Sequence, residues 1–219
     1  MNIQDLQDID DLKRRLEQAE RPEWGHSDYD LLPGSGPAGG KLKDAAVLVP
    51  IVVRPQGATV LLTRRTAHLS SHAGQISFPG GRAEPEDPSP EITALRETEE
   101  EVGIDRGHVR IVGRLDVYRT VTDYAVTPVV GLVSPGFRLQ PDPNEVAEVF
   151  ETPLSFLLDD RNHVRHSGWF NGKPRRWWAM PYDDYYIWGA TAGMLKNLHA
   201  RMTGKPSGGH QTSEVLGSR

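Results

Sequence analysis

The feature that most constrains this chain is a cluster of acids that follows a glycine pair and a turn rich in proline. The pair is Gly80-Gly81, and the turn leads to Ser89 and Pro90, which suit the N-cap and the first position of a helix. Gly103 suits the end of that helix. Within the predicted helix lie four acids, Glu97, Glu99, Glu100 and Glu101. The stretch therefore predicts a glycine turn followed by a strongly acidic helix.

Three of these carboxylates share one face of the helix. At about 100° per residue, Glu97 and Glu101 lie almost one above the other, and Glu100 flanks them. Ala94 and Val102 lie on other faces and can pack inward. Like charges at this spacing destabilise a helix by roughly 0.2–0.5 kcal/mol per pair. A bound divalent cation would explain the cluster, because hard cations prefer carboxylate oxygens and can also hold substrate phosphates. The alternative is a solvated acidic face with no ligand.

The same stretch resembles the Nudix box, Gx5Ex7REUxEExGU, in which U is a bulky apolar residue. Residues 96–104 match its second half, with Thr98 at the first apolar position. In the first half, counting from Gly81 reaches Asp87 rather than glutamate, and eight residues instead of seven separate it from Arg96. The half that carries the metal ligands in the family is intact.

This resemblance implies roles for individual side chains. The glutamates that match Glu97 and Glu101 bind the metal directly, and the one that matches Glu100 is a further ligand or helps to activate water. Arg96 matches an arginine that pairs with a carboxylate to hold its conformation. In the family an acid from outside the box sometimes serves as metal ligand or base. Glu145 is the candidate here, and charge on a helix surface is the alternative reading for it.

A second stretch, from Leu61 to Gly81, resembles the signature of the coenzyme A pyrophosphatase branch, LLTxR[SA]x3Rx3Gx3FPGG. The matching residues are Leu61, Leu62, Thr63, Arg65, Gly74, Phe78, Pro79, Gly80 and Gly81. Thr66 stands where the branch has Ser or Ala, and Ser70 stands where it has arginine. An arginine can bind a phosphate through bidentate, charge-assisted hydrogen bonds, and serine cannot.

Candidate substrate contacts come from three places. Arg64 and Arg65 are the nearest cations, but adjacent residues on a strand point to opposite faces, so at most one should face the substrate. The glycines at 80 and 81 permit a close approach of the backbone to the site. Arg119 and Tyr124 belong to a loop that borders the active site in the resembling branch, and loop packing is an equal alternative for both.

The remaining pattern predicts an α+β domain. Strands are expected at residues 45–53, 58–63, 108–117 and 125–133, a hairpin around 169–180, and a final helix over 185–202. The resemblance implies the Nudix fold, a mixed β-sheet sandwiched between α-helices. We expect an amphipathic helix and irregular connection in residues 1–40, the Nudix domain in 41–203, and a disordered tail in 204–219.

Charge and composition narrow the class of partner. The chain has 25 basic and 30 acidic residues, a formal net charge of −5, which argues against nonspecific nucleic-acid binding. It has no cysteine, so thiolate metal sites and cysteine nucleophiles are excluded. No apolar run of the roughly 18 residues that cross a membrane and no signal peptide are present, so we expect a cytoplasmic protein without membrane partners. The N-terminal amphipathic helix is compatible with a homodimer.

These expectations converge on a magnesium-dependent hydrolase, with manganese as the alternative metal. Its substrate would be a nucleoside diphosphate derivative. The resemblance implies coenzyme A or a derivative, which would yield 3′,5′-ADP and 4′-phosphopantetheine. A second hypothesis, favoured by Ser70, is cleavage of ADP-ribose or NADH. A third is a catalytically silent module that binds a nucleotide, against which the three intact glutamates argue. No Ser-His-Asp or cysteine arrangement is present, so direct attack by water is expected.

Overall fold

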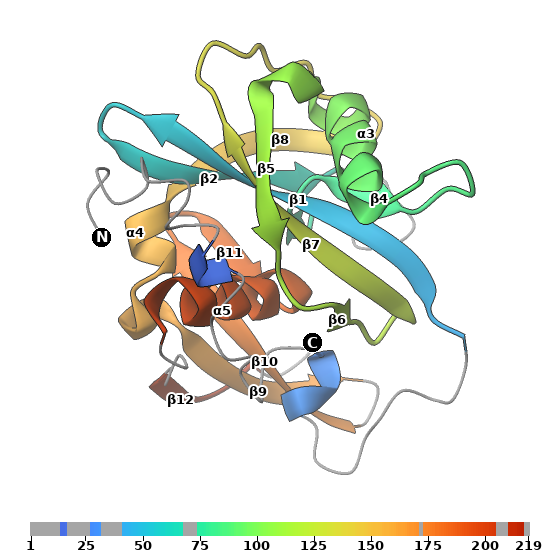
Figure 1. Cartoon of the computed structure of the whole chain (residues 1–219). Helices are drawn as coiled ribbons and strands as arrows, with labels where there is room; N and C mark the ends of the chain where they lie inside the picture. Colours follow the sequence, from blue (N-terminus) through green and yellow to red (C-terminus); the bar gives the residue numbers. More distant parts are fainter. Residues whose placement is uncertain are drawn as a thin grey trace.

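The computed structural model describes residues 14–16, 27–31, 41–67, 74–170, 173–204 and 210–216. These residues form an eight-stranded mixed sheet and a four-stranded sheet, with helices packed on both (Figure 1). Of the expected N-terminal helix, only Arg14–Leu16 are described, and they are helical. Ser70 lies outside the described residues.

Four strands pair consecutively across the large sheet, and the last of them lies at its edge. β1 (Lys43–Arg54) and β2 (Gly57–Arg65) form an antiparallel hairpin. β1 also runs parallel to β7 (Tyr124–Val133), which pairs antiparallel with β5 (Val109–Arg114). A strand inside a sheet that is covered on both faces has an almost continuous apolar sequence, as β1 does. The strands expected from the sequence are confirmed.

Short strands complete this sheet and bring the glycine pair beside β1. They are β3 (Ile76–Ser77), β4 (Gly80–Arg82), β6 (Tyr118–Arg119) and β8 (Val146–Pro153). β4 pairs with β1, β6 with β7, and both β3 and β8 with β2. The described residues also include three 3-10 helices, η1 (Asp28–Leu31), η2 (Arg106–His108) and η3 (Asp160–Asn162).

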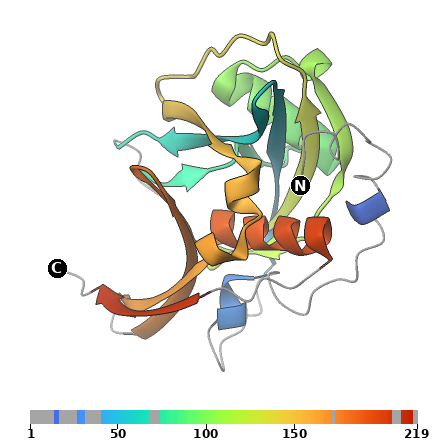
Figure 2. The same cartoon turned by 90° about the vertical axis from the view of Figure 1, so that its left-hand side faces the viewer.

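Helices cover both faces of the large sheet. On β1, Leu48 packs with Ala94 of α3 (Pro90–Val102), whereas Val49 belongs to the core that contains Leu195 of α5 (Ala190–Thr203). Successive residues of a strand point to opposite faces, so α3 and α5 lie on opposite sides of the sheet. α4 (Leu154–Leu157) packs beside β2 (Figure 2). The expected Nudix arrangement, a mixed sheet between helices, is confirmed.

The four-stranded sheet corrects one expectation, the start of the final helix, and it includes part of the expected tail. Its strands, in order, are β11 (Tyr185–Trp188), β10 (Lys173–Tyr182), β9 (Val164–Phe170) and β12 (His210–Leu216). The final helix was expected to include residues 185–188, but these aromatic and β-branched residues pair with the end of β10, and the helix begins only after Gly189. β12 pairs parallel to β9 within the tail for which disorder was expected. The division into domains stays a prediction.

No helix in the described part of the chain is both long and apolar enough to cross a membrane.

Candidate active site

α3 begins and ends as its sequence requires. Ser89 is extended at the N-cap, although its side chain makes no capping hydrogen bond, and Pro90 follows. At the other end Gly103 adopts a left-handed conformation, φ 73°, and its N–H donates to the carbonyl oxygen of Glu99. The side of α3 that carries Ala94 and Thr98 is fully buried. Burial of that side fixes the rotation of the helix, so that Glu101 is buried with it, whereas Glu97 is partly exposed and Glu100 is exposed.

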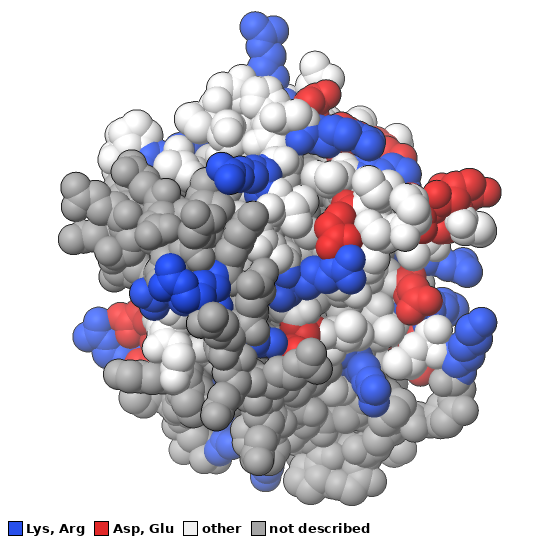
Figure 3. Space-filling model, viewed as in Figure 1, with Lys and Arg blue, Asp and Glu red and all other residues white. Residues whose placement is uncertain are grey.

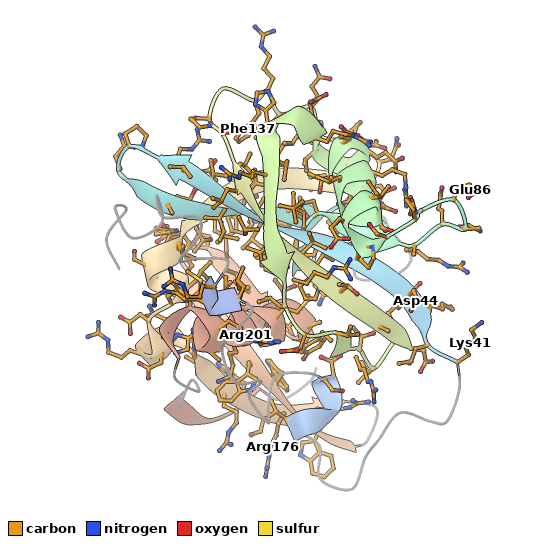
Figure 4. All side chains as sticks on the ribbon, in the orientation of Figure 1. Lys41, Asp44, Glu86, Phe137, Arg176 and Arg201 are labelled. Atoms are coloured by element: carbon orange, nitrogen blue, oxygen red, sulfur yellow. The ribbon has the colours of Figure 1, made fainter. Side chains whose placement is uncertain are left out.

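Asp87 and Arg96 are joined despite the altered spacing between them. Arg96 donates to the Asp87 carboxylate from Nε at 3.3 Å and from Nη2 at 2.9 Å. The Oγ1 of Thr93 and the N–H of Glu84 donate to the same carboxylate, each at 3.0 Å. Mainly because of the Arg96 bond, the pKa of Asp87 lies well below its usual range. Its neighbour Glu86 lies at the outer tip of the loop between β4 and α3 (Figure 4). The turn therefore absorbs the extra residue.

The same arginine also contacts two of the helix glutamates. Arg96 Nη1 lies 3.0 Å from Oε1 of Glu97 and 3.0 Å from Oε2 of Glu100. The Glu97 side chain is 17% exposed and that of Glu100 is 58% exposed. Burial is the largest cause that raises the pKa of Glu97; Arg96 opposes it, and the carboxylates of Glu100 and Glu145 add to it. Arg96 thus holds two of the candidate ligands while its other side is anchored to Asp87.

The two glycines of β4 are required for different reasons. At Gly80, φ is 153°, and an added Cβ would lie 2.5 Å from the Ala46 carbonyl oxygen and 2.5 Å from Val47 Cα. At Gly81 the Cβ would meet a side chain instead, 2.5 Å from Cδ of Glu97 and 2.6 Å from both carboxylate oxygens. Gly80 therefore allows β4 to pair closely with β1, whereas Gly81 leaves the space that the Glu97 carboxylate occupies.

Glu101 is the most enclosed member of the cluster, at 5% exposure. The N–H of Gly80 donates to its Oε2 at 3.0 Å, and Arg65 Nη1 lies 3.7 Å from its Oε1. Burial raises the pKa of Glu101 to about 8; the Gly80 bond and Arg65 oppose this rise, and Glu145 and Glu97 increase it. A carboxylate in such surroundings is stabilised in its charged form by a cation.

Glu145 reaches this cluster from the turn before β8, not from a helix as the alternative reading had it. Its N–H donates to the Asp142 carbonyl at 3.1 Å, and its own carbonyl accepts from the Thr66 N–H at 3.0 Å. Its charge raises the pKa of both Glu97 and Glu101. The turn that carries Glu145 is also bonded to α3, because the Asp142 N–H donates to the Glu101 carbonyl at 2.9 Å. The side chains of Glu145 and Glu100 are exposed.

The two arginines of β2 separate as expected. Arg65 approaches Glu101, whereas Arg64 Nη2 pairs with Glu148 at 3.1 Å, and its guanidinium lies 5.1 Å from the ring centroid of Tyr185. The Tyr185 hydroxyl donates to the same Glu148 at 2.6 Å. Arg64 therefore ties the large sheet to β11, and the expectation of a substrate contact applies better to Arg65.

Arg119 ends β6 and Tyr124 begins β7, so the two residues flank the turn between these strands. The Arg119 side chain is exposed, and its carbonyl accepts from the Ser27 hydroxyl at 3.0 Å. The Nζ of Lys43 lies 5.4 Å from the Tyr124 ring centroid. In the described part of the chain, no hydrogen bond or ion pair links either residue to the glutamates. Their substrate role stays a prediction.

Sequence reasoning missed the residues that support the cluster. Thr66 was noted only as a change from Ser or Ala, and Asp142 was not singled out, yet both hold the turn that carries Glu145. The available signal was an Asp-Pro-Asn sequence at 142–144, which is typical of a side-chain-stabilised turn.

The donor set fits a hard divalent cation, because the candidate ligands are carboxylate oxygens and a glycine leaves room for the Glu97 carboxylate. Arg96 and Arg65 neutralise part of this charge in the structure. Within the described ranges, no three His, Asp or Glu side chains already surround a common point suited to a metal ion.

On the face shown in Figure 3, acidic and basic side chains of the described residues are interspersed. The expectation that the protein has no nucleic-acid partner stays a prediction.

Comparison with known proteins gives consistent matches. The NUDIX domain model matches residues 42–171. The Nudix hydrolase NudL of Escherichia coli K12, described as uncharacterized, is 42% identical over 164 residues, covering 75% of this chain and 85% of the relative. NudL of Shigella boydii serotype 18 matches to the same extent. The crystal structure of the M. smegmatis Nudix hydrolase RenU superimposes with a TM-score of 0.53 at 18% identity, covering 75% of this chain and 88% of that chain.

Proposed function

This chain belongs to the Nudix hydrolase family, and we propose that it cleaves the diphosphate linkage of coenzyme A or a derivative with the help of Mg²⁺ or Mn²⁺. The family assignment makes it an enzyme that acts on pyrophosphate bonds of nucleoside diphosphate derivatives. The choice of substrate and metal is the proposal. The products would be 3′,5′-ADP and 4′-phosphopantetheine.

One observation carries the catalytic part of the proposal. The Glu97 carboxylate occupies the space left by Gly81, and Glu101 accepts a hydrogen bond from the N–H of Gly80. Two carboxylates one helical turn apart are thus fixed at the loop where the box resemblance expects the substrate diphosphate. Glu145, on the turn before β8, supports the same assignment through its electrostatic effect on both.

We assign the cation to Glu97 and Glu101, with Glu100 and Glu145 as further ligands or proton acceptors. A bound divalent cation would neutralise charge on the phosphate oxygens and lower the pKa of a water molecule. Arg96 orients Glu97 and Glu100, since Asp87 anchors its guanidinium from the other side. The exposed Glu100 and Glu145 are the carboxylates that solvent can reach, so either can accept the proton of the attacking water.

Arg65 is the best-placed cation for the substrate phosphate. Its guanidinium is near Glu101, and its Nε is buried with no hydrogen-bond partner among the described residues. A buried donor without a partner is costly, and a phosphate oxygen would supply the missing acceptor. Arg119 and Tyr124 remain predicted contacts for more distant parts of the substrate.

Coenzyme A is preferred because the signature from Leu61 to Gly81 matches at nine positions. ADP-ribose or NADH is the second candidate, because Ser70 replaces the arginine of that signature. These two substrate classes share the diphosphate and differ in the group beyond it, so the site chemistry does not separate them.

The test is to incubate the protein with Mg²⁺ and, separately, coenzyme A, ADP-ribose, NADH and diadenosine polyphosphates, and to identify products by mass spectrometry. We expect 3′,5′-ADP and 4′-phosphopantetheine from coenzyme A, with Mn²⁺ measured in parallel. The E97Q variant is the matched control, since it keeps the shape of the side chain and removes its charge. Cleavage of ADP-ribose with coenzyme A intact would overturn the substrate assignment, and no turnover by metal-loaded protein would favour the silent module.

A further inference from the structure

We infer that Thr66 and Asp142 are positioning residues that hold Glu145 facing the glutamates of α3, and thereby set the affinity of the site for its cation. This inference rests on the proposed metal-binding role of Glu145. What is new is the pair of residues, Thr66 and Asp142, that gives the exposed Glu145 carboxylate a defined position.

Thr66 fixes the turn from the side of β2. It follows directly after Arg65, its side chain is buried at 6% exposure, and its Oγ1 donates to the Asn144 carbonyl at 3.0 Å. Its N–H donates to the carbonyl of Glu145 at 3.0 Å. Two consecutive carbonyls of the turn are therefore bound to one residue, and that residue is adjacent to the arginine that contacts Glu101.

Asp142 fixes the turn from the side of α3. Its N–H donates to the Glu101 carbonyl at 2.9 Å, so the turn is bonded to the backbone of a proposed ligand. Its Oδ1 accepts from both the N–H and the Nδ2 of Asn144, each at 2.8 Å. Its carbonyl accepts from the N–H groups of Glu145 at 3.1 Å and of Val146 at 2.8 Å.

The pairing of β8 with β2 explains why this bracing is needed. The register shifts between Arg64 and Arg65, where Arg64 pairs with Glu148 but Arg65 pairs with Val146. A β-bulge of this kind changes the direction of the side chains beyond it and interrupts the regular hydrogen bonds between the two strands. Glu145 therefore lies just past the regular pairing, with an exposed side chain, and the bonds from Thr66 and Asp142 replace the ladder that would otherwise fix it.

The chain offers a matched control on the same pair of strands. Thr152 of β8 pairs with Val60 of β2 and is fully buried. Its Oγ1 has no hydrogen-bond partner among the described residues. T66V and T152V thus make the same change of hydroxyl to methyl, but only T66V breaks a bond to the Glu145 turn.

The experiment measures Mn²⁺ binding by electron paramagnetic resonance, without substrate, for the wild type, T66V, T66S, T152V and D142A. D142A removes the oxygen that accepts from Asn144. Outer residues that orient metal ligands typically contribute 10–100-fold to affinity, so we expect T66V and D142A to weaken Mn²⁺ binding about tenfold. T66S keeps the hydroxyl and should bind close to wild type, as should T152V. Circular dichroism and thermal unfolding establish that each variant is folded.

The same change is then made in the E145Q background. If Thr66 acts through Glu145, T66V causes no further loss of affinity once the carboxylate is gone, because residues in one network are not additive. The inference would be overturned if T66V bound Mn²⁺ as tightly as T152V does. It would also be overturned if T66V weakened Mn²⁺ binding equally in the wild-type and E145Q backgrounds. E97Q and E101Q, assayed for hydrolysis beside these variants, test the proposed function separately, since their outcome does not depend on Thr66.

Discussion

The substitution G81A moves the carboxylate of Glu97, a proposed metal ligand, without adding or removing a charge. An added Cβ would lie 2.5 Å from Cδ of Glu97, whereas ordinary contact begins at 3.4 Å. The carboxylate must therefore retreat by about 0.9 Å, the difference of these two distances. The obstructing atoms are the end of a flexible side chain, and Gly81 has no left-handed φ, so the backbone need not change.

We expect G81A to fold but to lose activity. A displacement of about 1 Å in catalytic geometry can lower the rate by roughly 100-fold. The kcat/KM for the diphosphate substrate should fall by about this factor, while the thermal unfolding midpoint remains within a few degrees of wild type. Mn²⁺ affinity should fall as well, because the displaced group is a proposed ligand.

Two other glycines supply controls for this variant. In G107A the new Cβ meets Asp105 Oδ1 at 2.8 Å, again a flexible carboxylate, but in the turn after α3 and outside the site, so kinetics should stay near wild type. In G80A the Cβ meets backbone atoms of Ala46 and Val47, so the fold itself should be destabilised. Wild-type kinetics for G81A, or unfolding of G81A, would refute the assigned reason for this glycine.

Three further predictions concern charge. E97Q and E101Q should each lower turnover by orders of magnitude in folded protein, and near-normal steady-state rates would contradict their assignment as ligands. D87N should lower kcat/KM about tenfold, since Arg96 loses its anchor, whereas E86Q on the same turn should not. Burial lowers the pKa of His163 to about 4, whereas an unfolded histidine has a pKa of about 6.5. Between these two pH values the imidazole is protonated in the unfolded chain and neutral in the folded protein. The free energy of unfolding should therefore rise with pH over this range. The increase in the free energy of unfolding is on the order of 3 kcal/mol. Urea titrations at about pH 4 and pH 6.5 measure this increase, which should be smaller in H163Q.

The sequence by itself determined the elements whose geometry is local. Ser89, Pro90 and Gly103 gave the bounds of α3, and helical periodicity placed Glu97, Glu100 and Glu101 on one face, because 3.6 residues per turn hold in any context. It also predicted the β1–β2 hairpin and the hairpin of β9 with β10. It failed at Tyr185–Trp188, where pairing with β10 decided between strand and helix.

Only the tertiary structure decided how these elements meet. Because the spacing of the box is altered, the sequence did not determine which residue pairs with Asp87. The structure shows that the turn brings Asp87 to Arg96. Alternation predicted that at most one of the two arginines faces the site, and the structure places Arg65 beside Glu101 and Arg64 beside Glu148. Glu145 joins the cluster through bonds from Thr66 and from a turn tied to α3. Such contacts depend on register and packing between segments distant in sequence, which no local pattern contains.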